Sequence, residues 1–177
     1  MQIAPKRTAD EDVREYLKRL RLLGFKTPTS RMIKTDEQII KAICEAGLEE
    51  NLQDMGYQPH ARAVDEQRKA SLLILPLRKE PEYKAVLPGK LFEYLASWRP
   101  VLGIGQTDGA MSMILNSTKT GLVLDWDDEA SISRFIELCW KNHLAGRLTV
   151  EDADISQFTR RNLTHRMAEL FDRLTRP

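Results

Sequence analysis

The chain has 177 residues, of which 42% are hydrophobic and 30% are charged, and its formal net charge is +1. These values are typical of a soluble globular domain, and the near-zero net charge gives no global electrostatic reason to expect nucleic acid or an acidic membrane surface as a partner. The two cysteines, Cys44 and Cys139, are too few for a disulfide framework or a metal cluster and suit a reducing cytosol. No apolar run is long enough to span a membrane, and the first residues lack the apolar core of a signal peptide.

In chain order, the first elements are helices and short strands. Acidic residues in the first turn predict a helix over residues 8–18, and an apolar run predicts a strand over 20–25. Thr35-Asp36-Glu37-Gln38 is a capping-box pattern that opens a second helix. Residues 51–55 form a further candidate strand, and residues 61–69 a polar helix.

From residue 71 onward, apolar runs and helical patterns alternate. The expected strands cover 71–77, 100–104 and 121–124, and the expected helices cover 88–97, 108–116, 126–144 and 158–174. This alternation predicts a single α/β domain over residues 1–177, with a Rossmann-like open parallel sheet and helices on both faces. The apolar stripe of the last helix, within residues 156–177, predicts that this helix packs on the domain or crosses to another one.

The most informative motif is Pro88-Gly89-Lys90-Leu91-Phe92-Glu93. It places backbone N–H groups and the Lys90 ammonium at a helix N-terminus, which favours anions. Glu93 follows one helical turn later on the same face, where a carboxylate could bind the sugar hydroxyls of a nucleotide whose phosphates lie at Lys90. The alternative is an ordinary surface ion pair between Lys90 and Glu93, worth about a few tenths of a kcal/mol.

Three pieces of sequence, in this order, resemble the C-terminal donor domain of retaining GT-B glycosyltransferases (glycosyl transferases group 1, family 4-like). The first is the turn Gly56-Tyr57-Gln58-Pro59-His60. The second is the motif at residues 88–96 with Arg99-Pro100-Val101-Leu102 after it, and the third is Gly121-Leu122-Val123-Leu124 followed by Asp127-Asp128. The resemblance covers roughly residues 20–174 and implies the C-terminal half of a GT-B fold.

The resemblance implies a role for each motif residue. Gly56, Tyr57, Gln58 and Pro59 would meet the nucleobase of a UDP- or GDP-sugar; Pro88, Gly89 and Lys90 would hold its diphosphate; and Glu93 would accept hydrogen bonds from the ribose. Lys90 and Glu82 are the candidate catalytic residues. The resemblance implies that Arg78, Lys79 and Glu82, on the loop before the motif, face the donor sugar or the acceptor cleft. Amides and one cation can stabilise the departing diphosphate without a metal or another cofactor.

Two residues depart from the family pattern. Many members have two glutamates eight positions apart, and Ala85 stands at the place of the first. Trp98 stands where a glycine commonly ends the helix, and a left-handed Trp98 would cost ~1 kcal/mol. Nothing before residue 20 could form an acceptor domain, so we expect this chain to be a fragment of a longer enzyme that alone binds its donor weakly and transfers nothing.

The expected function is donor binding for hexose transfer, with retention, to a glycan or a lipid-linked acceptor held by an N-terminal domain. The expected location is cytoplasmic, with peripheral association of the parent enzyme at the inner membrane face left open. One alternative is a nucleotide-sugar epimerase of the same architecture. Another is a non-catalytic Rossmann module used in assembly, which Ala85 favours.

Overall fold

The computed structural model describes residues 41, 43–45, 47–49, 52–53, 55–147, 149–150 and 153–175. The chain divides into two compact units, which we describe separately. Unit 1 comprises Met1–Leu73 and Asp128–Leu148, and unit 2 comprises Ile74–Asp127 and Thr149–Pro177.

The helix predicted over 8–18 and the strand over 20–25 lie outside the described residues. The helix predicted after Thr35 is described at Lys41 and residues 43–45, which are helical.

The sheet has three parallel strands in the order β1-β2-β3, with β1 at Leu73–Pro76, β2 at Val101–Ile104 and β3 at Gly121–Leu124. Strands β2 and β3 are paired from Val101 opposite Gly121 to Ile104 opposite Leu124. All three strands fall within predicted ranges, so the prediction of an α/β fold with an open parallel sheet is confirmed. The additional strand expected over 51–55 is absent at the described positions 52, 53 and 55.

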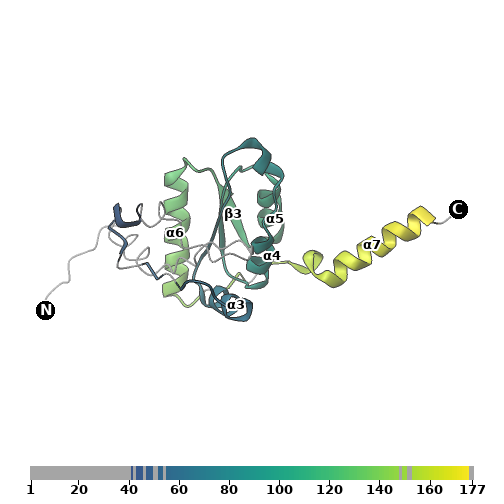
Figure 1. Cartoon of the computed structure of the whole chain (residues 1–177), viewed down its shortest axis with the longest axis horizontal. Helices are drawn as coiled ribbons and strands as arrows, with labels where there is room; N and C mark the ends of the chain where they lie inside the picture. Colours follow the sequence, from purple (N-terminus) through teal and green to yellow (C-terminus); the bar gives the residue numbers. More distant parts are fainter. Residues whose placement is uncertain are drawn as a thin grey trace. The chain divides into compact units, whose positions relative to one another are not determined.

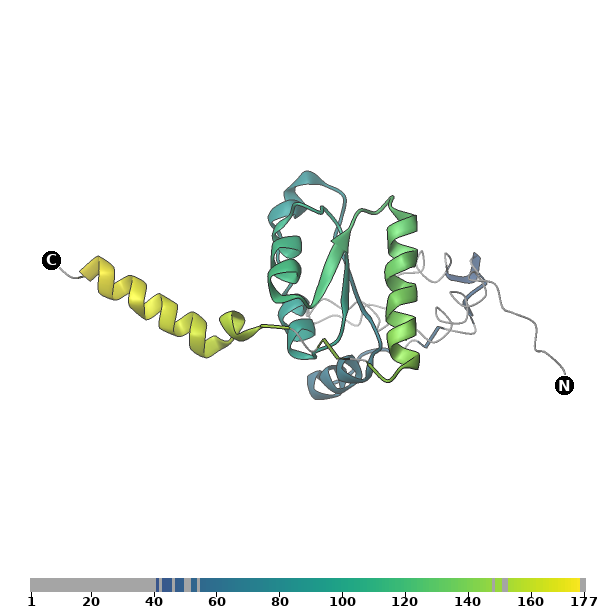
Figure 2. The same ribbon diagram turned by 180° about the vertical axis from the view of Figure 1, so that it is seen from behind.

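The first three helices of unit 2 lie between its strands in the sequence, and the last two follow them. Their bounds are Pro81–Ala85 for the 3₁₀ helix η2, Gly89–Ala96 for α4, Ala110–Thr118 for α5, Ser156–Phe158 for the 3₁₀ helix η3, and Arg160–Thr175 for α7. Helix α5 packs along β3, as both ribbon views show (Figures 1 and 2). The most deeply buried apolar side chains come from α4, β2 and α5: Leu91, Leu95, Val101, Leu102, Met111 and Leu115.

Unit 1 contains α3 at His60–Lys69 and α6 at Glu129–Leu144. Helix α6 begins where the acidic pattern predicts, because the Asp128 side chain accepts a hydrogen bond from the Ser131 N–H at 3.0 Å. It buries Ile136 and Cys139. The His143 ring is held by a 2.9 Å hydrogen bond between Nδ1 and the Ser71 hydroxyl.

Helix α7 has no buried residue. Leu163, Met167, Leu170, Phe171 and Leu174, which the sequence assigns to a docked face, are all exposed. The preceding turn is better packed, since the Phe158 and Phe92 rings lie 5.8 Å apart, centroid to centroid. Among the helices that the structure describes, none combines the length and apolarity needed to cross a lipid bilayer.

Candidate functional site

The candidate site lies at the carboxyl edge of the sheet, meaning the loops that follow Pro76, Ile104 and Leu124. Helix α5 follows β2 after five residues, whereas α4 follows β1 after the 3₁₀ helix η2 and three further residues. Parallel open sheets bind ligands here. Gly89 and Lys90 form the first turn of α4, the helix that connects β1 to β2.

The first turn of helix α4 has open space beside Gly89. Pro88 occupies the cap position and provides no side-chain hydrogen bond. The Leu91 N–H donates to the Pro88 carbonyl at 2.9 Å. A Cβ added at Gly89 would meet no atom within 4 Å, and the backbone there does not require glycine, because its φ is not in the left-handed region. Space next to the helix start is thus open to a ligand.

Lys90 and Glu93 lie one turn apart on α4, and both are half-buried. Burial lowers the pKa of Lys90, and the charge on Glu93 acts in the opposite direction. The charges of Lys90 and Glu93 therefore act on each other across one turn of α4. This geometry suits both the phosphate-and-ribose arrangement and the simple ion pair.

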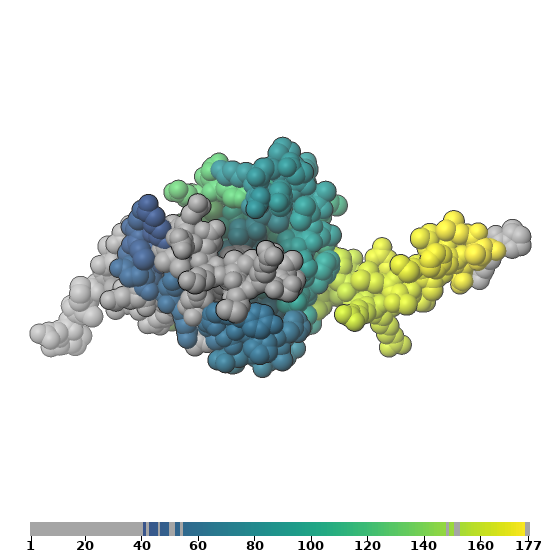
Figure 3. All heavy atoms as spheres, in the orientation of Figure 1, coloured from purple at the N-terminus to yellow at the C-terminus, as the bar shows by residue number. Residues whose placement is uncertain are grey.

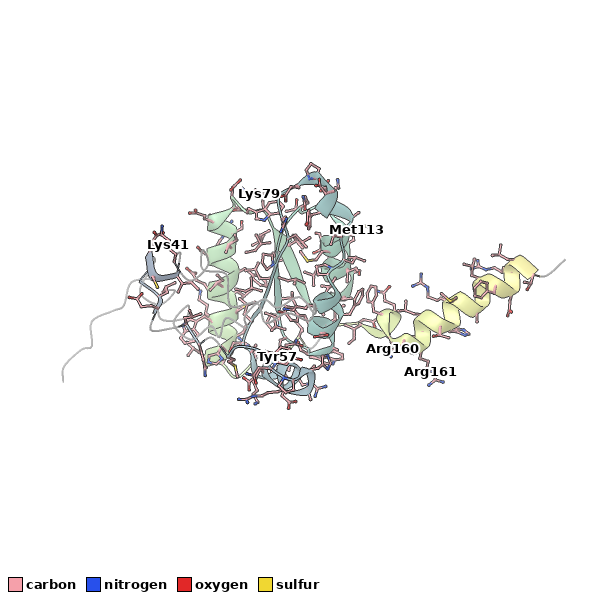
Figure 4. All side chains as sticks on the ribbon, in the orientation of Figure 1. Lys41, Tyr57, Lys79, Met113, Arg160 and Arg161 are labelled. Atoms are coloured by element: carbon pink, nitrogen blue, oxygen red, sulfur yellow. The ribbon has the colours of Figure 1, made fainter. Side chains whose placement is uncertain are left out.

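Ion pairs and hydrogen bonds connect the loops of the carboxyl edge. The Lys79 ammonium lies 2.7 and 2.9 Å from the two Asp127 carboxylate oxygens and 5.8 Å from the centroid of the Trp126 ring. The Trp126 indole N–H donates to the Leu77 carbonyl at 2.8 Å. Lys79, labelled in Figure 4, thus joins the loop after β1 to the loop after β3.

Gln106, the second residue after β2, connects a third loop. Its Nε2 donates to the carbonyls of Lys79 at 3.3 Å and Glu80 at 3.1 Å, and its Oε1 is buried with no hydrogen-bond partner among the described residues. The Lys84 ammonium pairs with Asp108, which lowers the pKa of that carboxyl. Sequence reasoning missed Gln106, Lys84 and Asp108, and the available signal was the position of Gln106 and Asp108 in the loop after β2.

The remaining predicted residues are placed as follows. Glu82 is exposed in η2, and the Arg78 guanidinium lies 5.8 Å from the centroid of the Tyr83 ring. The predicted nucleobase turn, which consists of Gly56, Tyr57, Gln58 and Pro59, belongs to unit 1. Gly56 has a φ of +58°, and the Gln58 side-chain amide donates a hydrogen bond to the Met55 carbonyl. Tyr57 is 75% exposed.

Comparisons with protein-family models, with curated protein sequences and with solved structures find no match to this chain. The residues that the structure describes contain no group of His, Cys, Asp or Glu side chains able to hold a metal ion.

Proposed function

We propose that this chain is the donor-nucleotide-binding domain of a retaining glycosyltransferase that uses a UDP- or GDP-sugar. In the complete enzyme, the hexose would pass to a glycan or lipid-linked acceptor. The observation that carries the proposal is the start of α4, where open space at Gly89 adjoins the half-buried Lys90 with Glu93 one turn away.

The chemistry of these groups supports binding of a diphosphate. First-turn amides and a lysine ammonium stabilise phosphate charge, and they do so more strongly as the bond to the sugar breaks. A carboxylate one turn away suits ribose hydroxyls. Glu82 is proposed as a further catalytic group. It lies in η2, where nearby Lys84 forms an ion pair with Asp108.

The test is isothermal titration of the protein with UDP, GDP and ADP. We expect one nucleotide to bind saturably, and Lys90→Ala to weaken it about tenfold or more, since a charge-assisted phosphate contact is worth about 1.5–3 kcal/mol. Glu93→Gln should also weaken binding. Lys141→Ala, which removes the same charge from an exposed position on α6, is the matched control and should leave the affinity within about twofold.

Gly89→Ala separates folding from binding. The added methyl meets no atom of the protein, so the fold should be retained, as circular dichroism would report. It would occupy the space proposed for the diphosphate, so affinity should fall. A folded protein that binds none of the three nucleotides would contradict the proposal and favour the non-catalytic module that Ala85 suggests.

A further inference from the structure

Helix α7 carries an apolar stripe that nothing in the described structure covers. Leu163, Met167, Leu170, Phe171 and Leu174 are between 44% and 73% exposed. At 3.6 residues per turn they share one side of the helix. In Figure 3 the atoms of α7 are drawn in yellow. Five large apolar side chains on one exposed helix face indicate an interaction surface.

The charges of α7 are arranged around this stripe. Helical spacing puts Arg166 and Arg173 along one border of the stripe, whereas Glu169 and Asp172 lie on the far side. Glu169 is paired there with His165, at 3.2 Å. Arg160 and Arg161 add positive charge at the first turn, where Figure 4 labels them. An apolar face bordered by arginines, with the acidic residues turned away, is complementary to a negatively charged surface with an apolar interior.

A second copy of the helix would be a poorer occupant. If Leu163 and Leu170 take d positions of a heptad, Met167 and Leu174 take a positions and the two bordering arginines take g positions. A g residue faces an e residue in a parallel pair and another g residue in an antiparallel pair. The e positions hold Thr164 and Phe171, so neither orientation gives the arginines an acidic partner.

We propose that α7 is a membrane-surface anchor: it lies in the interface of an anionic lipid bilayer with its apolar stripe among the acyl chains and Arg166 and Arg173 at the headgroups. This inference goes beyond the proposed function and does not depend on it. Nucleotide titration and vesicle binding therefore fail or succeed independently.

The test is co-sedimentation of the full chain with two vesicle preparations, phosphatidylcholine alone and an equal mixture of phosphatidylcholine and phosphatidylglycerol. We expect binding to the mixed vesicles only, weakened by added salt. Leu170→Gln should reduce binding about tenfold or more, because it replaces an apolar side chain of the stripe with a polar one. Since Leu170 is not buried in the protein, the variant should fold normally.

Two arginine variants serve as a matched pair within the helix. Arg166→Gln removes a charge bordering the stripe and should weaken binding several-fold, whereas Arg161→Gln, on the far side, should have a smaller effect. Three results would overturn the proposal: no binding to either vesicle, equal effects of both arginine variants together with no effect of Leu170→Gln, or a concentration-dependent dimer in analytical ultracentrifugation that Leu170→Gln abolishes.

Discussion

Among the residues that the structure describes, two with side chains adopt the left-handed backbone conformation that glycine favours: Trp98, with φ of 58°, and Lys119, with φ of 55°. Lys119 caps the C-terminal end of α5 and is exposed. We expect Lys119→Gly to stabilise the fold by about 0.5–1 kcal/mol, because it removes backbone strain without removing packing. Urea denaturation would measure this gain, and Lys119→Ala should show none of it.

At Trp98, packing of the side chain opposes the gain from relieving the backbone strain. Trp98 adopts the left-handed conformation whose cost was considered from the sequence for this position at the end of α4, but the residue is only 42% exposed. We expect Trp98→Gly to give no net stabilisation, because the lost burial of the ring, about 1–2 kcal/mol, offsets the relieved strain. A Trp98→Gly variant stabilised as much as Lys119→Gly would show that the ring contributes nothing.

Gly121 permits the close approach of β3 to β2. A Cβ there would lie 1.9 Å from the Val101 carbonyl oxygen, which is backbone and cannot move without disturbing the sheet. We expect Gly121→Ala to destabilise the protein by more than about 3 kcal/mol or to prevent folding. Gly105→Ala is the control, because its Cβ would make ordinary contacts of 3.5 Å or more, and its effect should be under about 1 kcal/mol. Thermal unfolding followed by circular dichroism would compare them.

At the scale of an element, α6 depends on its cap. The hydrogen bond from Ser131 lowers the pKa of the Asp128 carboxyl. Because the folded pKa is depressed, this stabilisation is present above the ordinary carboxyl value, about 3.9, and is lost as the pH falls through the folded value. We expect Asp128→Ala to lower the melting temperature by a few degrees at pH 7 and to have less effect at pH 3.

Asp128→Asn tests whether the hydrogen bond or the charge matters. The amide oxygen can still accept from the Ser131 N–H, so this variant should keep most of the stability at pH 7 without the pH dependence. Equal losses in the Ala and Asn variants would assign the effect to the charge at the helix N-terminus instead.

At the scale of the whole molecule, stability should decrease in alkaline solution. Burial raises the pKa of the Cys139 thiol and of the Tyr94 phenol to about 12 each. The unfolded chain would release these protons at lower pH, so above about pH 9 it binds fewer protons than the folded protein, and the free energy of unfolding falls as pH rises.

Urea unfolding between about pH 8 and pH 10.5 would measure this slope. Cys139→Val and Tyr94→Phe should each make it shallower, because neither replacement titrates. A slope that is unchanged in both variants would mean that other groups cause the alkaline loss.

Much of the fold could be predicted because its signals are local. Strand β1 is a short apolar run, β2 follows Pro100 and β3 begins at Gly121, so their limits were readable to within two residues. The start of α4 at Pro88 and Gly89 and the cap of α6 at Asp128 were readable for the same reason. The exposure of α7 could not be predicted, because a sequence shows the same apolar stripe whether or not another surface covers it.

From residue 60 onward, the sequence by itself determined the order of strands and α-helices. It also put Lys90 and Glu93 on one helical face, because side-chain spacing along a helix is fixed by helix geometry. Only the tertiary structure decided that Lys79 pairs with Asp127, and that Gln106 contacts the loop after β1. It also showed why Gly121 must be glycine. These contacts join residues that are 20 to 48 positions apart, and they depend on strand register and loop conformation, which no local pattern encodes.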